Sequence, residues 1–455
     1  MEYDDSAAFI LAELDFDKAA CIFGHLEASD AAGIAAEMEF ETSAGILQEM
    51  EFDAASNILA RMDPAVAAGS VSLMEAETAA HILAASQSYA KSAEITGHLT
   101  EECTAEILAE MEAEVAAGIV ADLDYDFSAA ALALMEAEHA GGIMEAAEVD
   151  DVAGIVGEME YENAASVISH VDSSTAATVL PQLEHEEASK IIAEMDADAA
   201  AAVVSDMEYT DSAGIISCMD AESAAQVVSQ MDYDAAAGLL AEADAGTSAG
   251  ILPELDMGDA TGIVSEMEAQ EAAAILAAAD EDTVLEIVAA MEYDYAAAAL
   301  AEMEFDGASN LLTQMEAGEA AYIVASLDHE TAANILTAAQ SHSKAAAIIS
   351  EMEVSDACKV CMQMEAPAAA GILAELEYDA ASDILGKMRM SEAAAVLAGL
   401  EYTDAAGVVE HMEQAKALPL LRAAEVDSDS ILKELSDQKA AENFRSKLAK
   451  RLRKD

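Results

Sequence analysis

The chain has 455 residues, of which 54% are hydrophobic, 91 acidic and 18 basic, so its formal net charge is −73. No apolar run reaches the ~18 to 20 residues that a membrane-spanning helix needs. A surface with this much negative charge repels nucleic acid and anionic membranes, and it attracts cations and basic protein surfaces. Composition therefore excludes membrane insertion and nucleic-acid binding. The N-terminus lacks a basic and apolar leader, which predicts a cytoplasmic location.

A twelve-residue repeat runs through almost the whole chain. Its anchor, an aliphatic residue in nearly every copy, recurs once per repeat over Ile10–Ile82, Ile95–Ile335 and Ile348–Val408, with one extra residue at each break, which makes 34 repeats. Small residues, mostly Ala, stand two and three places before the anchor. Met or Leu follows the anchor by four places in 28 repeats, and Asp or Glu follows it by five in 30. The apolar offsets mark one face of a helix.

The period of the repeat predicts short helices. Because an α-helix turns by 100° per residue, a continuous helix would rotate the apolar face by about a third of a turn in each repeat. Each repeat is therefore expected to form about nine helical residues and a three-residue turn, with acids such as Asp30, Asp211 and Asp404 as N-cap or first-turn residues. Helices this short must stack to be stable. The predicted fold class is all-α, an α-solenoid (superhelix) of about 34 single-helix repeats.

Glycine directly precedes the anchor in several repeats, for example at Gly118 and Gly154, and aromatic residues stand in many turns. Inside a helix, Gly costs about 1 kcal/mol relative to Ala, so we expect neighbouring helices to approach closely at these positions. The aromatic rings are expected to close the end of the small core over the next helix. The Met residues that follow the anchors are expected to be packing residues.

Two longer segments recur with a common offset. Residues 51–58 resemble residues 304–311, and residues 87–91 resemble residues 340–344, each at an offset of 253 residues. This offset predicts an internal duplication within one acidic solenoid domain of residues 1–413. Residues 414–455 differ, because they contain 10 of the 18 basic residues and only 7 acidic ones, and they predict a basic C-terminal helix.

The segment 369–377, Ala-Ala-Gly-Ile-Leu-Ala-Glu-Leu-Glu, contains the whole pattern of small pair, anchor, Leu and acidic turn. This repeat resembles that of the N-terminal intracellular domain of the MgtE magnesium transporters, and the flagellar motor switch protein FliG carries related helices. The resemblance covers residues 5–413. It implies a superhelix of short helices in which acidic residues take part in magnesium sensing. No CBS domain or transmembrane segment is recognisable after the repeats, so transport is not implied.

Turns of the form acid, aromatic, acid are the candidate metal sites. Repetition would place their carboxylates in rows along the solenoid, and clustered oxygen ligands bind hard cations such as Mg²⁺ and Ca²⁺. Weak multisite binding of these ions is one interpretation, and a solvated acidic face whose acids cap helices is the other. No other cofactor is expected. The candidate ligands are Asp15, Asp17, Glu51, Asp53, Asp124, Asp126, Glu160, Glu162, Asp232, Asp234, Glu377 and Asp379.

The basic C-terminal segment is the candidate docking element. Residues 444–454 have the pattern of a basic amphipathic helix. Such a helix either caps the open end of the stack or docks on an acidic surface, of another copy of the chain or of a different partner. The residues expected to carry the docking are Arg445, Lys447, Lys450, Arg451, Arg453 and Lys454.

Nothing in the sequence indicates catalysis. Cys358 and Cys361 have the spacing of a redox pair, but they stand on an ordinary repeat helix, where two small core residues are expected. The sequence therefore predicts a non-enzymatic scaffold, an acidic solenoid that binds basic or extended segments of protein partners within a larger assembly. A cytoskeletal or ciliary assembly is one such setting. A soluble Mg²⁺ or Ca²⁺ buffer or sensor that uses the acidic turns is the alternative.

Overall fold

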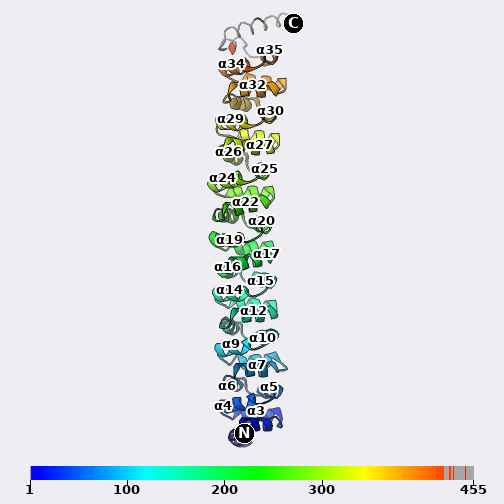
Figure 1. The fold of residues 1–455 in the computed structure, drawn as a ribbon, viewed down its shortest axis with the longest axis vertical. Helices are drawn as coiled ribbons and strands as arrows, with labels where there is room; N and C mark the ends of the chain where they lie inside the picture. The colour runs from blue at the N-terminus through cyan, green and yellow to red at the C-terminus, as the bar shows by residue number, and fades with distance from the viewer. Residues whose placement is uncertain (1, 425–429, 432–433, 435–445, 447–455) are drawn as a thin grey trace. The chain divides into compact units, whose positions relative to one another are not determined.

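The structure, a computed structural model, describes residues 2–424, 430–431, 434 and 446. Over these residues the chain forms α-helices and two short 3-10 helices, without a strand, and the all-α prediction is confirmed. The chain divides into two compact units, Met1–Met231 and Asp232–Asp455. Each unit is a stack of short helices (Figure 1).

The helices of the first unit are α1 (Glu2–Ala12), α2 (Phe16–Phe23), α3 (Ala28–Ala36), α4 (Phe40–Gln48), α5 (Phe52–Leu59), α6 (Pro64–Val71), α7 (Ala76–Ala84), α8 (Tyr89–Thr96), α9 (Glu101–Ala109), α10 (Ala113–Val120), α11 (Tyr125–Ala133), α12 (Ala137–Ala146), α13 (Val149–Gly157), α14 (Tyr161–Ile168), α15 (Ser173–Val179), η1 (Leu180–Gln182), α16 (His185–Glu194), α17 (Ala197–Asp206), α18 (Tyr209–Ile216) and α19 (Ala221–Val228).

The helices of the second unit are α20 (Tyr233–Glu242), α21 (Ala245–Ile251), η2 (Leu252–Glu254), α22 (Met257–Glu266), α23 (Ala269–Ala278), α24 (Glu281–Ala290), α25 (Tyr293–Glu302), α26 (Phe305–Gln314), α27 (Ala317–Ser326), α28 (His329–Thr337), α29 (His342–Glu351), α30 (Val354–Gln363), α31 (Ala366–Leu373), α32 (Tyr378–Lys387), α33 (Met390–Gly399), α34 (Tyr402–His411) and α35 (Gln414–Ala423).

Each repeat forms one helix, as the period predicts. The 34 anchors fall one by one on α1 to α34. Within each unit, a helix packs chiefly against the helix two places further along the chain. Helix α35 lies beyond the predicted domain boundary at residue 413 and packs against α33 in the same way. The described stack therefore continues to Ala423.

The helices begin at a different acid from the one expected. The N-cap is the acid five places after the preceding anchor, for example Glu39 for α4 and Glu51 for α5, and its backbone is extended, with φ −61° and ψ 139° at Glu39. Asp30 and Asp211 lie in the first turn of α3 and α18. The first-turn expectation is thus confirmed and the N-cap expectation is wrong for these acids. The chain leaves one helix at the Met position, so the next residue is the first that can start another.

Helix α4 illustrates how the core is built. Ser43, Ala44, Ile46 and Leu47 are at most 1% exposed, and Met50 is 7% exposed. These residues hold the offsets −3, −2, 0, +1 and +4 from the anchor, so the predicted apolar face is the buried one. Small residues at the first two offsets leave room for the aliphatic pair of the neighbouring helix, because helix axes approach closely only where the contacting side chains are small.

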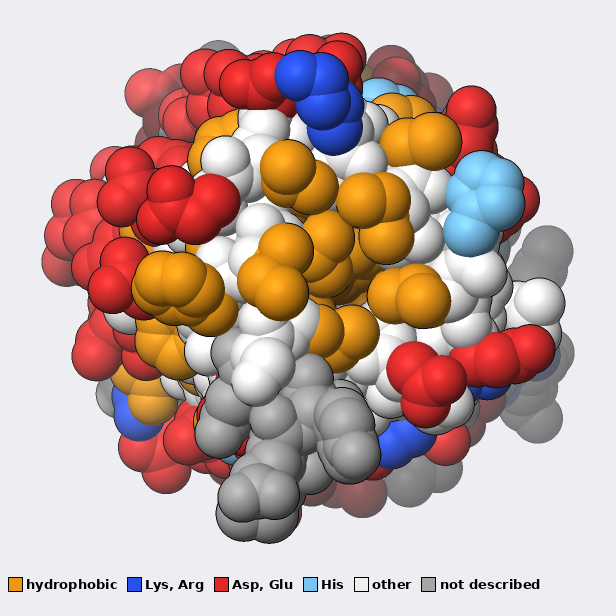
Figure 2. Space-filling view, turned by 90° about the horizontal axis from the view of Figure 1, so that it is seen from below, with side chains coloured by type: hydrophobic (Ala, Val, Ile, Leu, Met, Phe, Trp, Pro, Cys, Tyr) orange, Lys and Arg blue, Asp and Glu red, His pale blue; other side chains and the backbone are white. Residues whose placement is uncertain are grey.

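The first two helices show what the stacking contributes. Their anchors Ile10 and Ile22 are 64% and 41% exposed, and Phe9 is 72% exposed. No described helix lies two places before α1 or α2, so the face that other repeats bury stays open. Figure 2 shows this end of the first unit, where hydrophobic side chains gather in the middle and acidic side chains surround them.

Buried hydroxyl groups join consecutive helices. Ser92 Oγ donates to the carbonyl oxygen of Leu83 at 2.9 Å, and Ser128 Oγ donates to that of Val120 at 3.2 Å. In each case a Ser three places before its anchor reaches the residue after the previous anchor. Each carbonyl also accepts a backbone N–H at the helix end, from Ser86 to Leu83 and from Leu123 to Val120, each at 3.2 Å, so the hydroxyl adds a second donor that comes from the next helix.

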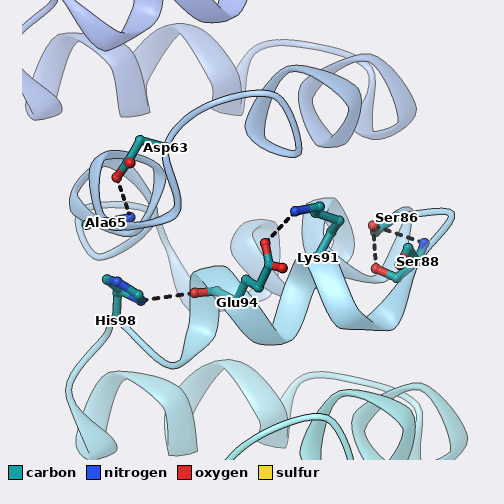
Figure 3. A network of polar contacts seen from close by, with 7 residues as sticks. All are labelled: Asp63, Ala65, Ser86, Ser88, Lys91, Glu94 and His98. Carbon is teal, nitrogen blue, oxygen red and sulfur yellow. Dashed lines mark hydrogen bonds and ion pairs between the residues drawn. The ribbon is translucent and has the colours of Figure 1, made fainter.

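The extra residue at each break of the repeat lengthens the linker between two helices. Before α8, Ser86 Oγ donates to the carbonyl oxygen of Ser88 at 3.0 Å and accepts from its N–H at 3.3 Å. Within α8, Lys91 pairs with Glu94 (Figure 3). The Ser86 side chain thus closes the linker through the backbone of Ser88, and α8 still packs against α6 and α10.

Candidate functional site

The candidate metal ligands lie where the helices start. In each acid, aromatic, acid turn the first acid is the N-cap of the following helix, the aromatic residue is its first helical residue, and the second acid is in its first turn. Negative charge at a helix N-terminus is stabilised by the helix dipole. The helices thus start at Asp15, Glu51, Asp124, Glu160, Asp232 and Glu377, followed in the first turn by Asp17, Asp53, Asp126, Glu162, Asp234 and Asp379.

All twelve of these carboxylates are exposed. The contacts that they make are local. Asp126 Oδ1 accepts from the N–H of Phe127 at 2.9 Å, Asp379 Oδ1 from that of Ala380 at 2.9 Å, and Asp15 pairs with Lys18. Among the residues that the structure describes, no three His, Cys, Asp or Glu side chains are grouped so that they could hold a metal ion. Cation binding at the turns stays a prediction.

A second type of helix start uses Asp followed by Ser or Thr. Asp244 Oδ1 accepts from the N–H groups of Gly246 at 3.0 Å and Thr247 at 3.1 Å, and the Thr247 hydroxyl donates to Oδ2. These bonds favour the charged carboxylate, so the hydroxyl and the N–H of Thr247 lower the pKa of Asp244. Hydrogen bonds from a Ser or Thr three places along lower the pKa in the same way at Asp220, Asp280 and Asp328.

The aromatic residues of the turns pack on glycines that stand two repeats and five places further along the chain. A Cβ atom built on Gly154 would lie 2.3 Å from Cε2 of Tyr125, and one built on Gly45 would lie 2.3 Å from Cε2 of Phe16. The same spacing joins Tyr89 to Gly118, Phe40 to Gly69, His185 to Gly214, Tyr233 to Gly262, His342 to Gly371 and Tyr378 to Gly407.

This arrangement corrects two expectations. The ring covers the second helix along rather than the next one, because helices two places apart are the ones that pack together. The glycine makes room for a ring and not for a helix backbone. Where no aromatic or His stands at the same spacing before the glycine, as at Gly142 and Gly250, a Cβ atom would meet nothing within 4 Å. The signal was present in the sequence as this constant spacing between ring and glycine.

Hydrogen bonds fix several of these rings at their outer edge. Tyr125 Oη donates to Asp151 Oδ1 at 2.9 Å, and Tyr233 Oη donates to Asp259 Oδ1 at 3.1 Å. The accepting carboxylate stabilises the protonated phenol, so the bond to Asp151 raises the pKa of Tyr125. The first-turn acid of one helix therefore positions the aromatic residue of the helix two places before it.

Flat or long side chains replace the glycine in other repeats. His81 stacks on Phe52 with ring centroids 5.0 Å apart, and Lys190 Nζ lies 5.4 Å from the centroid of the Tyr161 ring. Tyr322 stacks on Tyr293 at 5.1 Å. All three pairs keep the spacing of the ring and glycine pairs. The contact between helices two places apart is thus retained with different chemistry.

The cysteine pair lies in the core of α30. Cys358 and Cys361 are 4% and 1% exposed. Burial disfavours the thiolate and raises the pKa of Cys361 to about 12. This matches the predicted role of two small core residues. Ser248, in the segment Gly246–Gly250 with the spacing of a hydrolase nucleophile motif, is also buried on a helix, and its Oγ donates to the Leu240 carbonyl oxygen at 2.7 Å.

The candidate docking residues Arg445, Lys447, Lys450, Arg451, Arg453 and Lys454 lie outside the described residues. Their predicted role stays a prediction. In the described part of the chain, no helix is of the length and hydropathy that crossing a membrane would require.

The family of the MgtE intracellular N domain matches residues 3–91, 139–234, 198–265, 247–344 and 340–440. The chain belongs to this family. The matched segments follow one another along the chain. They contain every candidate metal turn except that of α11. No curated protein sequence matches the chain. The resemblance of the repeats to the MgtE N domain is thus confirmed, and the relation to FliG stays a prediction.

Proposed function

We propose that this MgtE N-type repeat protein is a non-enzymatic scaffold whose acidic surface binds basic or extended segments of protein partners within a larger assembly. The observation that carries the proposal is the exposed acid at nearly every helix start, repeated with the period of the helices. A solenoid presents such a row over a long surface, because each repeat adds one helix in a fixed relation to its neighbours.

The charge is distributed in a way that favours a basic partner. Residues 191–343 contain 31 acidic residues and no Lys or Arg. Over this stretch no cation within the sequence offsets the carboxylates, so the field along the described helices is negative. Surfaces of one sign attract partners of the other and raise their rate of association.

The aromatic contacts between helices two places apart support a rigid surface. A ring that sits on a glycine and is held by a carboxylate leaves little freedom between the two helices that it joins. Carboxylates held in position lose less freedom on binding than those of a disordered polyanion. Such preorganisation increases affinity without adding contacts.

The test is a titration of the purified chain with fluorescein-labelled decalysine at ~150 mM salt, where long-range interactions are largely screened. The control is polyglutamate of the same net charge. The proposal expects saturable binding with a dissociation constant at least about tenfold lower for the chain than for polyglutamate, a difference of about 1.4 kcal/mol. Equal affinities would show attraction to a polyanion alone and would contradict the proposal.

The same preparation separates the scaffold from the cation buffer. Calorimetric titration with Mg²⁺ and Ca²⁺ at the same salt concentration should give only weak, featureless heats if the acids serve a protein partner. Saturable binding with a defined stoichiometry, together with a rise in thermal stability, would favour the buffer or sensor, because a ligand stabilises the state to which it binds.

A further inference from the structure

The repeat of α24 departs from all the others at one position that sets the distance between helices. Thirty-three repeats have Ala, Gly, Ser, Thr or Cys two places before the anchor, whereas α24 has Leu285 there, with Val284 beside it. Leu285 is partly exposed, although this position is buried in almost every other helix. Among the described residues, α24 and α26 pack less closely than any other pair of helices two places apart within a unit.

A cavity of about 330 Å³ lies between α23, α24 and α26. Two further departures from the repeat enlarge it. Ala279 stands where 28 of the 34 repeats have Met or Leu, and Gly307 on α26 stands where the corresponding residue of the duplicated segment, Ala54, has a methyl group. The apolar lining is completed by Leu276, Val284, Met303 and Leu311. The volume of the cavity is at the lower end of the range for ligand pockets, and it suits one large side chain.

The rim of this cavity is acidic and ordered. Glu281, the first residue of α24, accepts hydrogen bonds from the side-chain amides of Asn310 and Gln314 on α26. Glu304, the N-cap of α26, also lines the opening. The rim lies within the stretch 191–343 that contains no Lys or Arg. An occupant therefore needs an apolar group for the cavity and positive charge for the rim.

We propose that this cavity, between Ala279, Gly307 and the α24 side chains, is an anchor pocket for a basic peptide segment that carries one large apolar side chain between Lys or Arg residues. The apolar side chain enters the cavity, and its basic neighbours lie against Glu281 and Glu304. The inference rests on the proposed function and gives it a site, since acidic rows alone attract basic segments in any register. An anchor pocket fixes one register, as apolar anchors do in protein interfaces.

The experiment compares two fluorescein-labelled peptides, Lys-Lys-Leu-Lys-Lys and Lys-Lys-Ala-Lys-Lys, by fluorescence anisotropy with the full chain at ~150 mM salt. The Leu peptide should bind at least about tenfold more tightly, since burial of a leucine side chain supports a difference of that size. Ala279→Met places the residue of the other repeats into the cavity, and it should abolish the preference for Leu while it leaves the affinity for the Ala peptide unchanged.

Two variants complete the test. Gly307→Ala adds a methyl group whose nearest neighbour would be Met303 Cε at 3.8 Å, so it fits the fold and should reduce the preference for Leu. Ala147→Met makes the same change at the same repeat position in the first unit and should keep the preference. If both peptides bind equally to the wild-type chain, or if Ala279→Met keeps the preference, the pocket is refuted while the scaffold stands. If neither peptide binds, the scaffold fails and the pocket with it.

Discussion

Replacement of Gly154 by Ala tests whether the contacts between turn aromatics and glycines hold the stack together. In a helix interior, Gly to Ala is normally stabilising by about 0.8 to 1.0 kcal/mol, because Ala restricts the unfolded chain and favours the helix. At Gly154 the added Cβ atom would lie 2.3 Å from Cε2 and 2.5 Å from Cδ2 of Tyr125. The ring must therefore leave its position on α13.

The cost of this displacement equals or exceeds the gain in helix propensity. Overpacking of a well-filled contact costs about 1 to 3 kcal/mol. The displaced ring would also lose the hydrogen bond from Tyr125 Oη to Asp151. Subtraction of about 1 kcal/mol of propensity leaves Gly154→Ala between neutral and about 2 kcal/mol destabilising. Gly142→Ala is the matched control, since Gly142 also precedes its anchor and its Cβ atom would meet nothing within 4 Å. It should stabilise by about 1 kcal/mol.

The assay is urea unfolding followed by circular dichroism, with hydrogen exchange of the α13 amides as a local measure, because long repeat arrays do not unfold in a single step. The two variants should differ by about 1 to 3 kcal/mol. In a Tyr125→Ala background Gly154→Ala should become stabilising, like the control. If Gly154→Ala stabilises the wild-type chain as much as Gly142→Ala does, the ring does not hold α11 and α13 together.

Three further predictions concern buried and capping groups. The buried Oγ of the anchor Ser70 has no hydrogen-bond partner, so Ser70→Ala should raise the free energy of unfolding by about 1 kcal/mol. Ser128 Oγ donates a hydrogen bond, so Ser128→Ala should lower the free energy of unfolding by a similar amount, and urea midpoints measure both changes. Thr247→Val should destabilise the chain at neutral pH, because the Thr247 hydroxyl stabilises only the charged carboxylate of Asp244. The difference should vanish as the pH falls through the folded-state pKa of Asp244, which lies below its ordinary value, and urea midpoints of both chains measured from neutral to acidic pH test this. Cys361 should react with a thiol reagent at pH ~8 only after unfolding, and labelling in the native state would contradict its burial.

The twelve-residue repeat in the sequence was sufficient to predict the local fold. In any repeat, two small residues followed by an aliphatic pair, Met and an acid give a helix of about nine residues and a turn. These residues act within one helix and at the start of the next, so the pattern can be interpreted without knowledge of the tertiary structure. The family match and the helix in every repeat confirm this. The acidic character of the surface also followed from the sequence, because almost every acid stands outside the five apolar offsets.

The acid that caps each helix, the partner of each ring and the cavity beside α24 were decided by packing. Which residue starts a helix depends on where the preceding helix can end, and Met at the +4 position ends it one residue before the cap. Tyr125 could meet Gly154 only once helices two places apart were in contact, a relation that no single repeat contains. Ala279 and Gly307 were visible as departures from the pattern, but the cavity that they line appears only where three helices meet.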